Sequence, residues 1–111
     1  MNKWTTYARG RTKIGEMNGL ETKYSKHLES RIQNGEILWF DYEGIKFRLA
    51  KGSHYTPDFA MMMADGTMEC HETKGYWRDN GRTKIKIAAE KFPFRFIGVQ
   101  WKKKQWEYEE F

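Results

Sequence analysis

A strand–helix–strand pattern in the second half of the chain most constrains what this sequence can fold into. Residues 83–92 place their apolar side chains on one helical face. Pro93 then ends the helix, because proline lacks the N–H group that a helix interior needs, and an apolar strand follows at residues 94–101. Another strand precedes the helix at residues 67–74. Strands joined by a helix normally lie parallel, with a right-handed crossover, so we expect an α/β fold.

Length and composition limit the number of domains and the classes of partner that are possible. A chain of 111 residues fits one domain, because a second core would lack apolar material. Its 20 Lys and Arg outnumber its 15 Asp and Glu, and the net charge of +5 favours nucleic acid as a partner without requiring it. The only cysteine, Cys70, excludes an intramolecular disulfide and fits a reducing cytoplasm. No apolar run has the length of a membrane span, so we expect no membrane association.

The first 17 residues lack a sustained apolar period. They contain Arg9, Arg11 and Lys13, and we interpret residues 1–17 as a basic arm before a single folded domain at residues 18–111. The arm is either a frayed terminus or a segment that follows DNA or embraces a partner.

A first amphipathic helix is expected at residues 18–33, where apolar residues recur at every fourth position before Asn34-Gly35. At about 100° per residue, Glu21 points towards the apolar face of this helix. A buried charge without a partner is strongly disfavoured. Glu21 is therefore either a metal ligand that faces inward or an exposed first-turn residue stabilised by the helix dipole.

Two hairpins are expected after this helix. The first joins residues 37–40 to residues 45–49 through a Glu-Gly pair, and the second joins residues 55–63 to residues 67–74 through Ala64-Asp65-Gly66. The second hairpin carries the residues with the strongest chemical interest.

The register of the second hairpin decides whether its acidic residues meet. A three-residue loop with Gly66 in the left-handed region would place Asp58 opposite Glu72. A two-residue loop would place Asp58 opposite Thr73 and turn Glu72 to the other face. Because side chains alternate along a strand, Lys74 lies on the same side as Glu72. The hypothesis of a shared site depends on the first register.

Two carboxylates and the backbone carbonyl of Thr73 would be hard oxygen ligands, which suit Mg²⁺ or Mn²⁺. Such an ion makes a bound water more acidic and neutralises charge on a phosphate. Lys74 would orient or help deprotonate that water, or hold the phosphate. Zinc is disfavoured because Cys70-His71 has no recognised ligand spacing, and we expect no small-molecule cofactor.

The segments Tyr55-Thr56-Pro57-Asp58-Phe59 and Glu72-Thr73-Lys74-Gly75-Tyr76 resemble the signature of the PD-(D/E)XK nuclease superfamily. Glu21 matches the acidic residue that many branches carry on the preceding helix. Residues 18–101 resemble small phage-encoded Holliday junction resolvases of the endonuclease I type. The resemblance implies a restriction-endonuclease-like core, a central mixed β-sheet flanked by helices. The implied catalytic residues are Glu21, Asp58, Glu72 and Lys74, and the implied metal ligands are Asp58, Glu72, Glu21 and the Thr73 carbonyl.

The resemblance also implies an activity: Mg²⁺-dependent hydrolysis of DNA phosphodiester bonds, selective for branched DNA, in a bacterial or phage-infected host cytoplasm. A symmetric junction needs two cuts, so a homodimer is expected. The alternatives are a monomeric nicking or repair-type nuclease and a non-catalytic nucleic-acid-binding module. The joint presence of Asp58, Glu72 and Lys74 argues against the module.

Basic and aromatic residues around these motifs could bind phosphates or stack on bases, although a plain surface loop would have a similar composition. Lys86 is expected to be ordinary solvated surface. The candidate DNA-binding residues are Arg9, Arg11, Lys13, His54, Tyr76, Trp77, Arg78, Arg82, Lys84 and Lys91.

Overall fold

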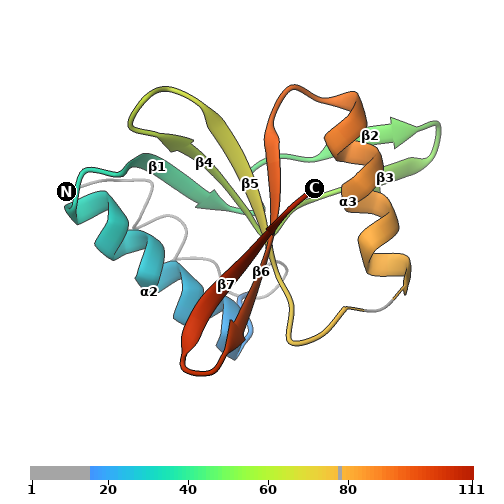
Figure 1. Cartoon of the computed structure of the whole chain (residues 1–111). Helices are drawn as coiled ribbons and strands as arrows, with labels where there is room; N and C mark the ends of the chain where they lie inside the picture. The colour runs from blue at the N-terminus through green and yellow to red at the C-terminus, as the bar shows by residue number, and fades with distance from the viewer. Residues whose placement is uncertain (1–15, 78) are drawn as a thin grey trace.

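The computed structural model describes residues 16–77 and 79–111. Its elements, in order, are α2 (Gly19–Gln33), β1 (Ile37–Tyr42), β2 (Phe47–Ala50), β3 (Ser53–Tyr55), β4 (Phe59–Met63), β5 (Met68–Thr73), α3 (Asp79–Lys91), β6 (Arg95–Lys102) and β7 (Gln105–Glu110). Five strands form a mixed sheet in the order β1-β4-β5-β6-β7. Helix α2 lies on one side of this sheet, and α3 lies on the other with the β2–β3 hairpin (Figure 1). The α/β class is confirmed, and the arrangement is compatible with a restriction-endonuclease-like core.

The predicted crossover is present. Strands β5 and β6 are parallel, with Glu72 level with Gly98, and α3 connects them. The helix begins at residue 79, earlier than the predicted residue 83. The prediction started too late because the first turn contains polar residues, which do not contribute to the apolar period. Residue 93 follows the helix, as the proline predicts.

The predicted hairpin between residues 37–40 and 45–49 is wrong. Strand β1 pairs with β4, and β2 pairs with β3 in a separate two-stranded sheet. Glu43, at φ 52°, and Gly44 form a corner that takes the chain away from the main sheet. Gly44 is needed there, because a Cβ atom would come within 2.8 Å of Oδ2 of Asp41. A local turn signal cannot distinguish such a corner from a hairpin.

The strand expected at residues 55–63 is interrupted. Strand β3 ends at Tyr55 and β4 begins at Phe59, so Pro57 and Asp58 lie between them. Proline has no N–H group for a sheet ladder. The carbonyl of Asp58 accepts instead from the amide of Glu43, at 2.7 Å. The interruption lets the chain pass from the small sheet to the main one.

Of the two loops left open by the sequence, the structure has the three-residue loop between β4 and β5. The amide of Met63 donates to the carbonyl of Thr67 at 2.8 Å, and Gly66 has φ 89°. Phe59 is paired with His71, so the register brings Asp58 level with Glu72. This is the register that the shared-site hypothesis requires.

Two apolar clusters cover the two faces of the sheet. Tyr24 and Leu28 of α2 are fully buried on one face, and Ile85 and Ala88 of α3 are fully buried on the other. The helices described by the structure, α2 and α3, are both too short and too polar to cross a membrane.

Replacing Gly66 by alanine tests the loop. No atom lies within 4 Å of the Cβ position, so the penalty comes from the backbone alone. A left-handed alanine costs about 1–2 kcal/mol, and we expect Gly66→Ala to lower the free energy of unfolding by that amount in urea denaturation. Gly19→Ala is the matched control: its Cβ position is equally open and φ is not positive, so alanine should be neutral or stabilising. Equal effects would contradict the assigned turn.

Candidate active site

Asp58 and Glu72 lie side by side at the end of the sheet. Each is only 8% exposed. The amide of Asp58 donates to Oε1 of Glu72 at 3.3 Å. Thr73 donates twice to Oδ2 of Asp58, from its amide at 2.9 Å and its hydroxyl at 3.0 Å. The residues that the sequence analysis paired are brought together, and Thr73 positions Asp58 through groups that the analysis had not considered.

Lys74 extends the site towards solvent. Its Nζ atom lies 3.3 Å from Oε2 of Glu72, and its side chain is 36% exposed. Its backbone amide donates to the carbonyl of Val99, which fixes the end of β5 against β6. The ammonium group is thus held beside a buried carboxylate and remains accessible to a ligand.

Glu21 reaches the same region from the first turn of α2. Asn18 and Glu21 form a capping box: the Asn18 side chain accepts from the amide of Glu21, and Oε1 of Glu21 accepts from the amide of Asn18 at 2.9 Å. Glu21 is nevertheless buried, and its charge contributes to raising the pKa of Asp58. Glu21 is thus a first-turn residue that faces inward, and the alternative of an exposed first-turn residue is wrong.

Two tyrosines hold the carboxylates. Tyr42, at the end of β1, donates from its hydroxyl to Oε1 of Glu21 at 2.8 Å. Tyr55, at the end of β3, donates to Oε1 of Glu72 at 2.9 Å. Neither role was predicted from the sequence. The only available signal was the position of each tyrosine at a strand end, and that signal does not specify a hydrogen-bond partner.

Burial raises the proton affinity of both Asp58 and Glu72. Burial raises the pKa of Asp58 to about 8, and the charges of Glu72 and Glu21 act in the same direction. Burial also raises the pKa of Glu72, although the charge of Lys74 opposes the shift. The site therefore has an excess of negative charge that a cation would relieve.

Whether these residues suit a divalent metal ion depends on the ligand atoms that they offer. Asp58 and Glu72 offer hard oxygen atoms, as Mg²⁺ prefers, and few protein ligands suffice for an ion that keeps several waters. Among residues 16–77 and 79–111, no group of three or more His, Cys, Asp or Glu side chains is arranged to hold a metal. Asp58 and Glu72 are thus a pair of oxygen donors of the type that Mg²⁺ and Mn²⁺ accept.

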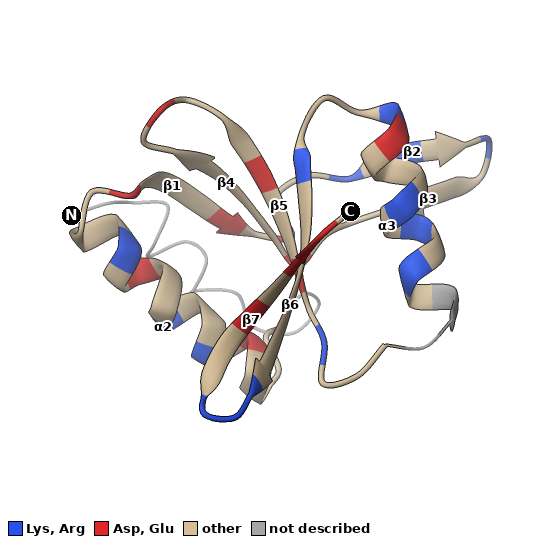
Figure 2. Cartoon of the chain, viewed as in Figure 1, with Lys and Arg blue, Asp and Glu red and all other residues tan. Residues whose placement is uncertain are grey.

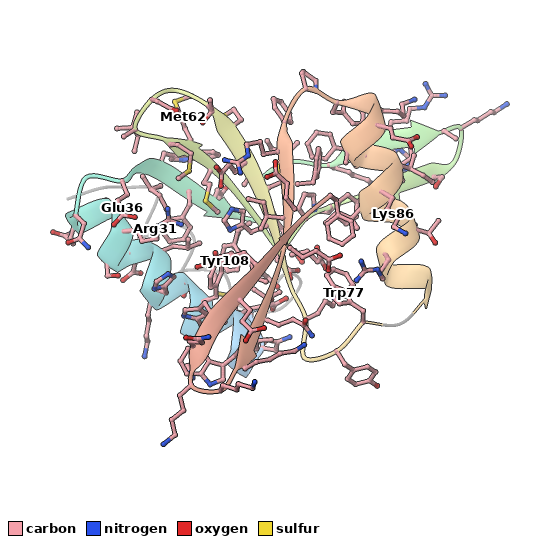
Figure 3. The ribbon with its side chains drawn as sticks, viewed as in Figure 1. Arg31, Glu36, Met62, Trp77, Lys86 and Tyr108 are labelled. Atoms are coloured by element: carbon pink, nitrogen blue, oxygen red, sulfur yellow. The ribbon has the colours of Figure 1, made fainter. Side chains whose placement is uncertain are left out.

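Aromatic rings line one side of the site. A Cβ atom on Gly98, which is level with Glu72, would come within 2.6 Å of Trp77, so this indole covers the strand (Figure 3). Trp77 also contacts the ring of Phe111. Tyr76, in contrast, is 66% exposed, so it is the aromatic residue of this loop that a ligand can reach.

Several of the candidate DNA-binding residues have partners within the protein. Arg82 pairs with Glu109. Lys84 donates to the carbonyl of His54 at 2.9 Å, and Lys91 donates to the carbonyl of Leu49 at 3.2 Å. These lysines thereby fasten the β2–β3 hairpin to α3. The candidates Arg9, Arg11, Lys13 and Arg78 lie outside the described residues.

His71 points away from the site, as its alternation with Glu72 predicts. Its Nδ1 atom lies 2.7 Å from the hydroxyl of Tyr24 on α2, and its Nε2 atom lies 2.9 Å from Oε1 of Glu69. Burial lowers the pKa of His71. The imidazole is therefore part of the core beneath α2.

Two phage proteins resemble the chain. It is 37% identical over 90 residues to endonuclease I of Escherichia phage T7, covering 78% of this chain and 54% of that protein. It is 38% identical over 79 residues to endodeoxyribonuclease 1 of Enterobacteria phage T3, covering 68% of this chain and 46% of that protein. The chain thus spans about half the length of the curated relatives that it matches. No protein-family model and no solved structure matches it. The similarities support a relationship to phage endonucleases.

The raised pKa of Asp58 predicts how the stability of the protein depends on pH. Its folded value, about 8, exceeds its ordinary value of 3.8, so the unfolded chain loses this proton first and stability falls as pH rises between these values. Without metal, Asp58→Asn should therefore have a higher Tm than the wild type at pH 8, with a smaller difference near pH 5. Asp65→Asn is the control, since hydrogen bonds from Thr67 lower the pKa of that exposed carboxylate and no gain is expected. Equal Tm values at pH 8 for Asp58→Asn and the wild type would contradict a desolvated pair.

Proposed function

We propose that this chain is a DNA endonuclease that hydrolyses phosphodiester bonds, with Asp58, Glu72, Lys74 and Glu21 in its active site. The observation that carries the proposal is the buried contact between Asp58 and Glu72, with the Lys74 ammonium beside it. Similarity to two phage endonucleases supports DNA as the substrate. The Pro-Asp and Glu-Thr-Lys segments support membership of the PD-(D/E)XK superfamily.

Asp58, Glu72 and the carbonyl of Thr73 would hold Mg²⁺ or Mn²⁺, and the carboxylate of Glu21, which acts on the pKa of Asp58, would add negative charge beside them. The ion would supply positive charge beside the phosphate and make water more acidic. Thr73 keeps Asp58 oriented through two hydrogen bonds, and Tyr55 keeps Glu72 oriented through one. The protein thus presents preorganised oxygen ligands whose charge is partly balanced before DNA binds.

Lys74 has two roles open to it, because its ammonium is both paired and accessible. It can donate to an oxygen of the scissile phosphate, or it can orient the attacking water. In the reaction, the water oxygen bonds to phosphorus, one phosphoester P–O bond breaks, and the departing oxygen takes up a proton. A cation near Glu72 stabilises the negative charge that develops on the phosphate.

Branched DNA is the substrate that we favour, on the resemblance of the motifs and their order to junction resolvases. Nicking of ordinary duplex by a monomer is the second candidate, and binding without cleavage is the third. A panel of intact duplex, single strand, flap and four-way junction with Mg²⁺ separates them. The buried Cys70 fits action in a reducing cytoplasm, where we place the protein. Tyr76 remains the best placed of the predicted DNA contacts in the loop after β5.

Substitution of the acidic and basic residues tests catalysis. Asp58→Asn, Glu72→Gln and Lys74→Ala should each lower the rate of cleavage at saturating DNA by about 100-fold or more, because each removes a ligand or a charge at the phosphate. Lys86→Ala is the control: this exposed residue lies on α3 (Figure 3) and should keep wild-type rates.

Metal binding can be measured in the same variants without DNA. Millimolar Mg²⁺ should raise the Tm of the wild type at pH 8 and leave that of Asp58→Asn unchanged, since an ion that binds only the folded state stabilises it. Cleavage by Asp58→Asn at the wild-type rate would refute the assigned site. Failure of the wild type to cut any substrate in the panel would favour the binding module.

The proposed junction substrate predicts a homodimer. A four-way junction needs two cuts, and two identical subunits related by a two-fold axis would place one active site at each. Analytical ultracentrifugation of the wild type with a four-way junction should therefore show two protein chains per junction. A single chain per junction would count against junction resolution and favour the monomeric nicking nuclease.

A further inference from the structure

The end of β6 and the turn that follows it carry Lys102, Lys103 and Lys104, here called the basic tip (Figure 2). The last pair between β5 and β6 is Thr73 with Val99, so the β6–β7 hairpin continues beyond the end of β5. The active site lies at this same end, because Val99 accepts from the amide that follows Thr73. At about 3.3 Å per residue, the four residues from Val99 to Lys103 span about 13 Å.

The backbone of the tip is strained. Lys103 has φ 52° and Lys104 has φ 61°. A two-residue turn with positive φ at both positions is of type I′ and favours Asn-Gly, because most side chains are disfavoured in the left-handed region. Turn formation therefore does not explain two lysines here. Within the described residues, neither lysine has an ion-pair partner.

A cation and an indole lie next to the basic tip. Nζ of Lys23 is 3.3 Å from the ring centroid of Trp101, which is 37% exposed and packs edge-on against Trp106. Lys23 is exposed and follows Glu21 by two residues on α2. Positive charge therefore continues from the basic tip towards the active site.

Strand β7 has three acidic residues, of which Glu107 lies nearest to the basic tip and the other two are paired with arginines. Glu109 pairs with Arg82, and Glu110 pairs with Arg95. Lys102 is near enough to Glu109 to contribute to lowering its pKa.

We propose that the basic tip, with Lys23 and Trp101 next to it, binds the phosphate backbone of the DNA arm that leads away from the active site. This inference rests on the proposed nuclease function. Phosphates follow one another at 3.4 Å of helix rise along each strand, so a reach of about 13 Å corresponds to roughly four base pairs. Lysine contacts to phosphate position a duplex without reading its sequence.

The test replaces the turn by its preferred residues. The double variant Lys103→Asn, Lys104→Gly removes two charges and relieves the left-handed strain, so it should fold with an equal or higher Tm. Its binding to a fluorescent four-way junction and a 30-base-pair duplex is measured by anisotropy in Ca²⁺ at several salt concentrations. The control variant Lys46→Gln, Lys51→Gln removes two exposed charges beside the β2–β3 hairpin.

We expect the turn variant to bind DNA roughly 10- to 30-fold more weakly at 150 mM salt, with the slope of log K against log salt reduced by about 2. The cleavage rate at saturating DNA should stay within about twofold, because no active-site group changes. The control should keep the wild-type slope.

An unchanged slope and Kd in the turn variant, alongside normal wild-type cleavage, would overturn the role of the basic tip and leave the nuclease proposal standing. An equal loss in the control would also overturn it, because only net charge would then matter. A wild type that neither binds nor cuts any DNA would refute both proposals.

Discussion

The register between β4 and β5 is the constraint on which the rest of the structure depends. Side chains alternate between the two faces of a strand, so a slip of one residue would turn Glu72 away from Asp58 and towards α2. The loop that ends in the left-handed Gly66 fixes the register, and β5 is buried on both faces, so a slip would also expose core residues. The same pairing directs His71 to Tyr24 and holds Cys70 in the cluster beneath α3. Core packing and active-site geometry are therefore specified together.

Burial of several carboxylates at one end of the sheet opposes folding, and the protein offsets this locally. Tyr42 and Tyr55 donate to Glu21 and Glu72 from strands of two different sheets, and Thr73 donates to Asp58. These donors do not fully balance the charge, because the pKa of Asp58 remains raised. Under the proposed function, a divalent cation supplies the remaining positive charge. The metal-free protein would then be held in a state that favours binding of the ion.

Basic residues divide into those that hold the fold and those that remain free for a partner. Lys84 and Lys91 bind carbonyl groups of the β2–β3 hairpin, and Arg82 pairs with Glu109. Their candidacy as DNA contacts came from their charge and their place after the second motif, and neither feature reveals an intramolecular partner. The basic tip, in contrast, projects beyond the end of β5. Charge in a sequence thus predicts the class of partner better than it predicts the contact residues.

The sequence by itself determined the α/β class, the parallel crossover and the place of the turn between β4 and β5, because periodicity, proline and glycine act over a few residues. It left two registers open for that turn. It also singled out Asp58, Glu72 and Lys74 as one group, on the condition that the turn takes the three-residue register, which the structure supplied. Only the tertiary structure decided that β1 pairs with β4 rather than β2, because strand pairing depends on packing between distant segments. It also decided which tyrosines donate to the carboxylates and that Glu21 is buried. Each tyrosine is 17 to 21 residues from the glutamate that accepts its hydrogen bond, so no local signal in the sequence connects the two.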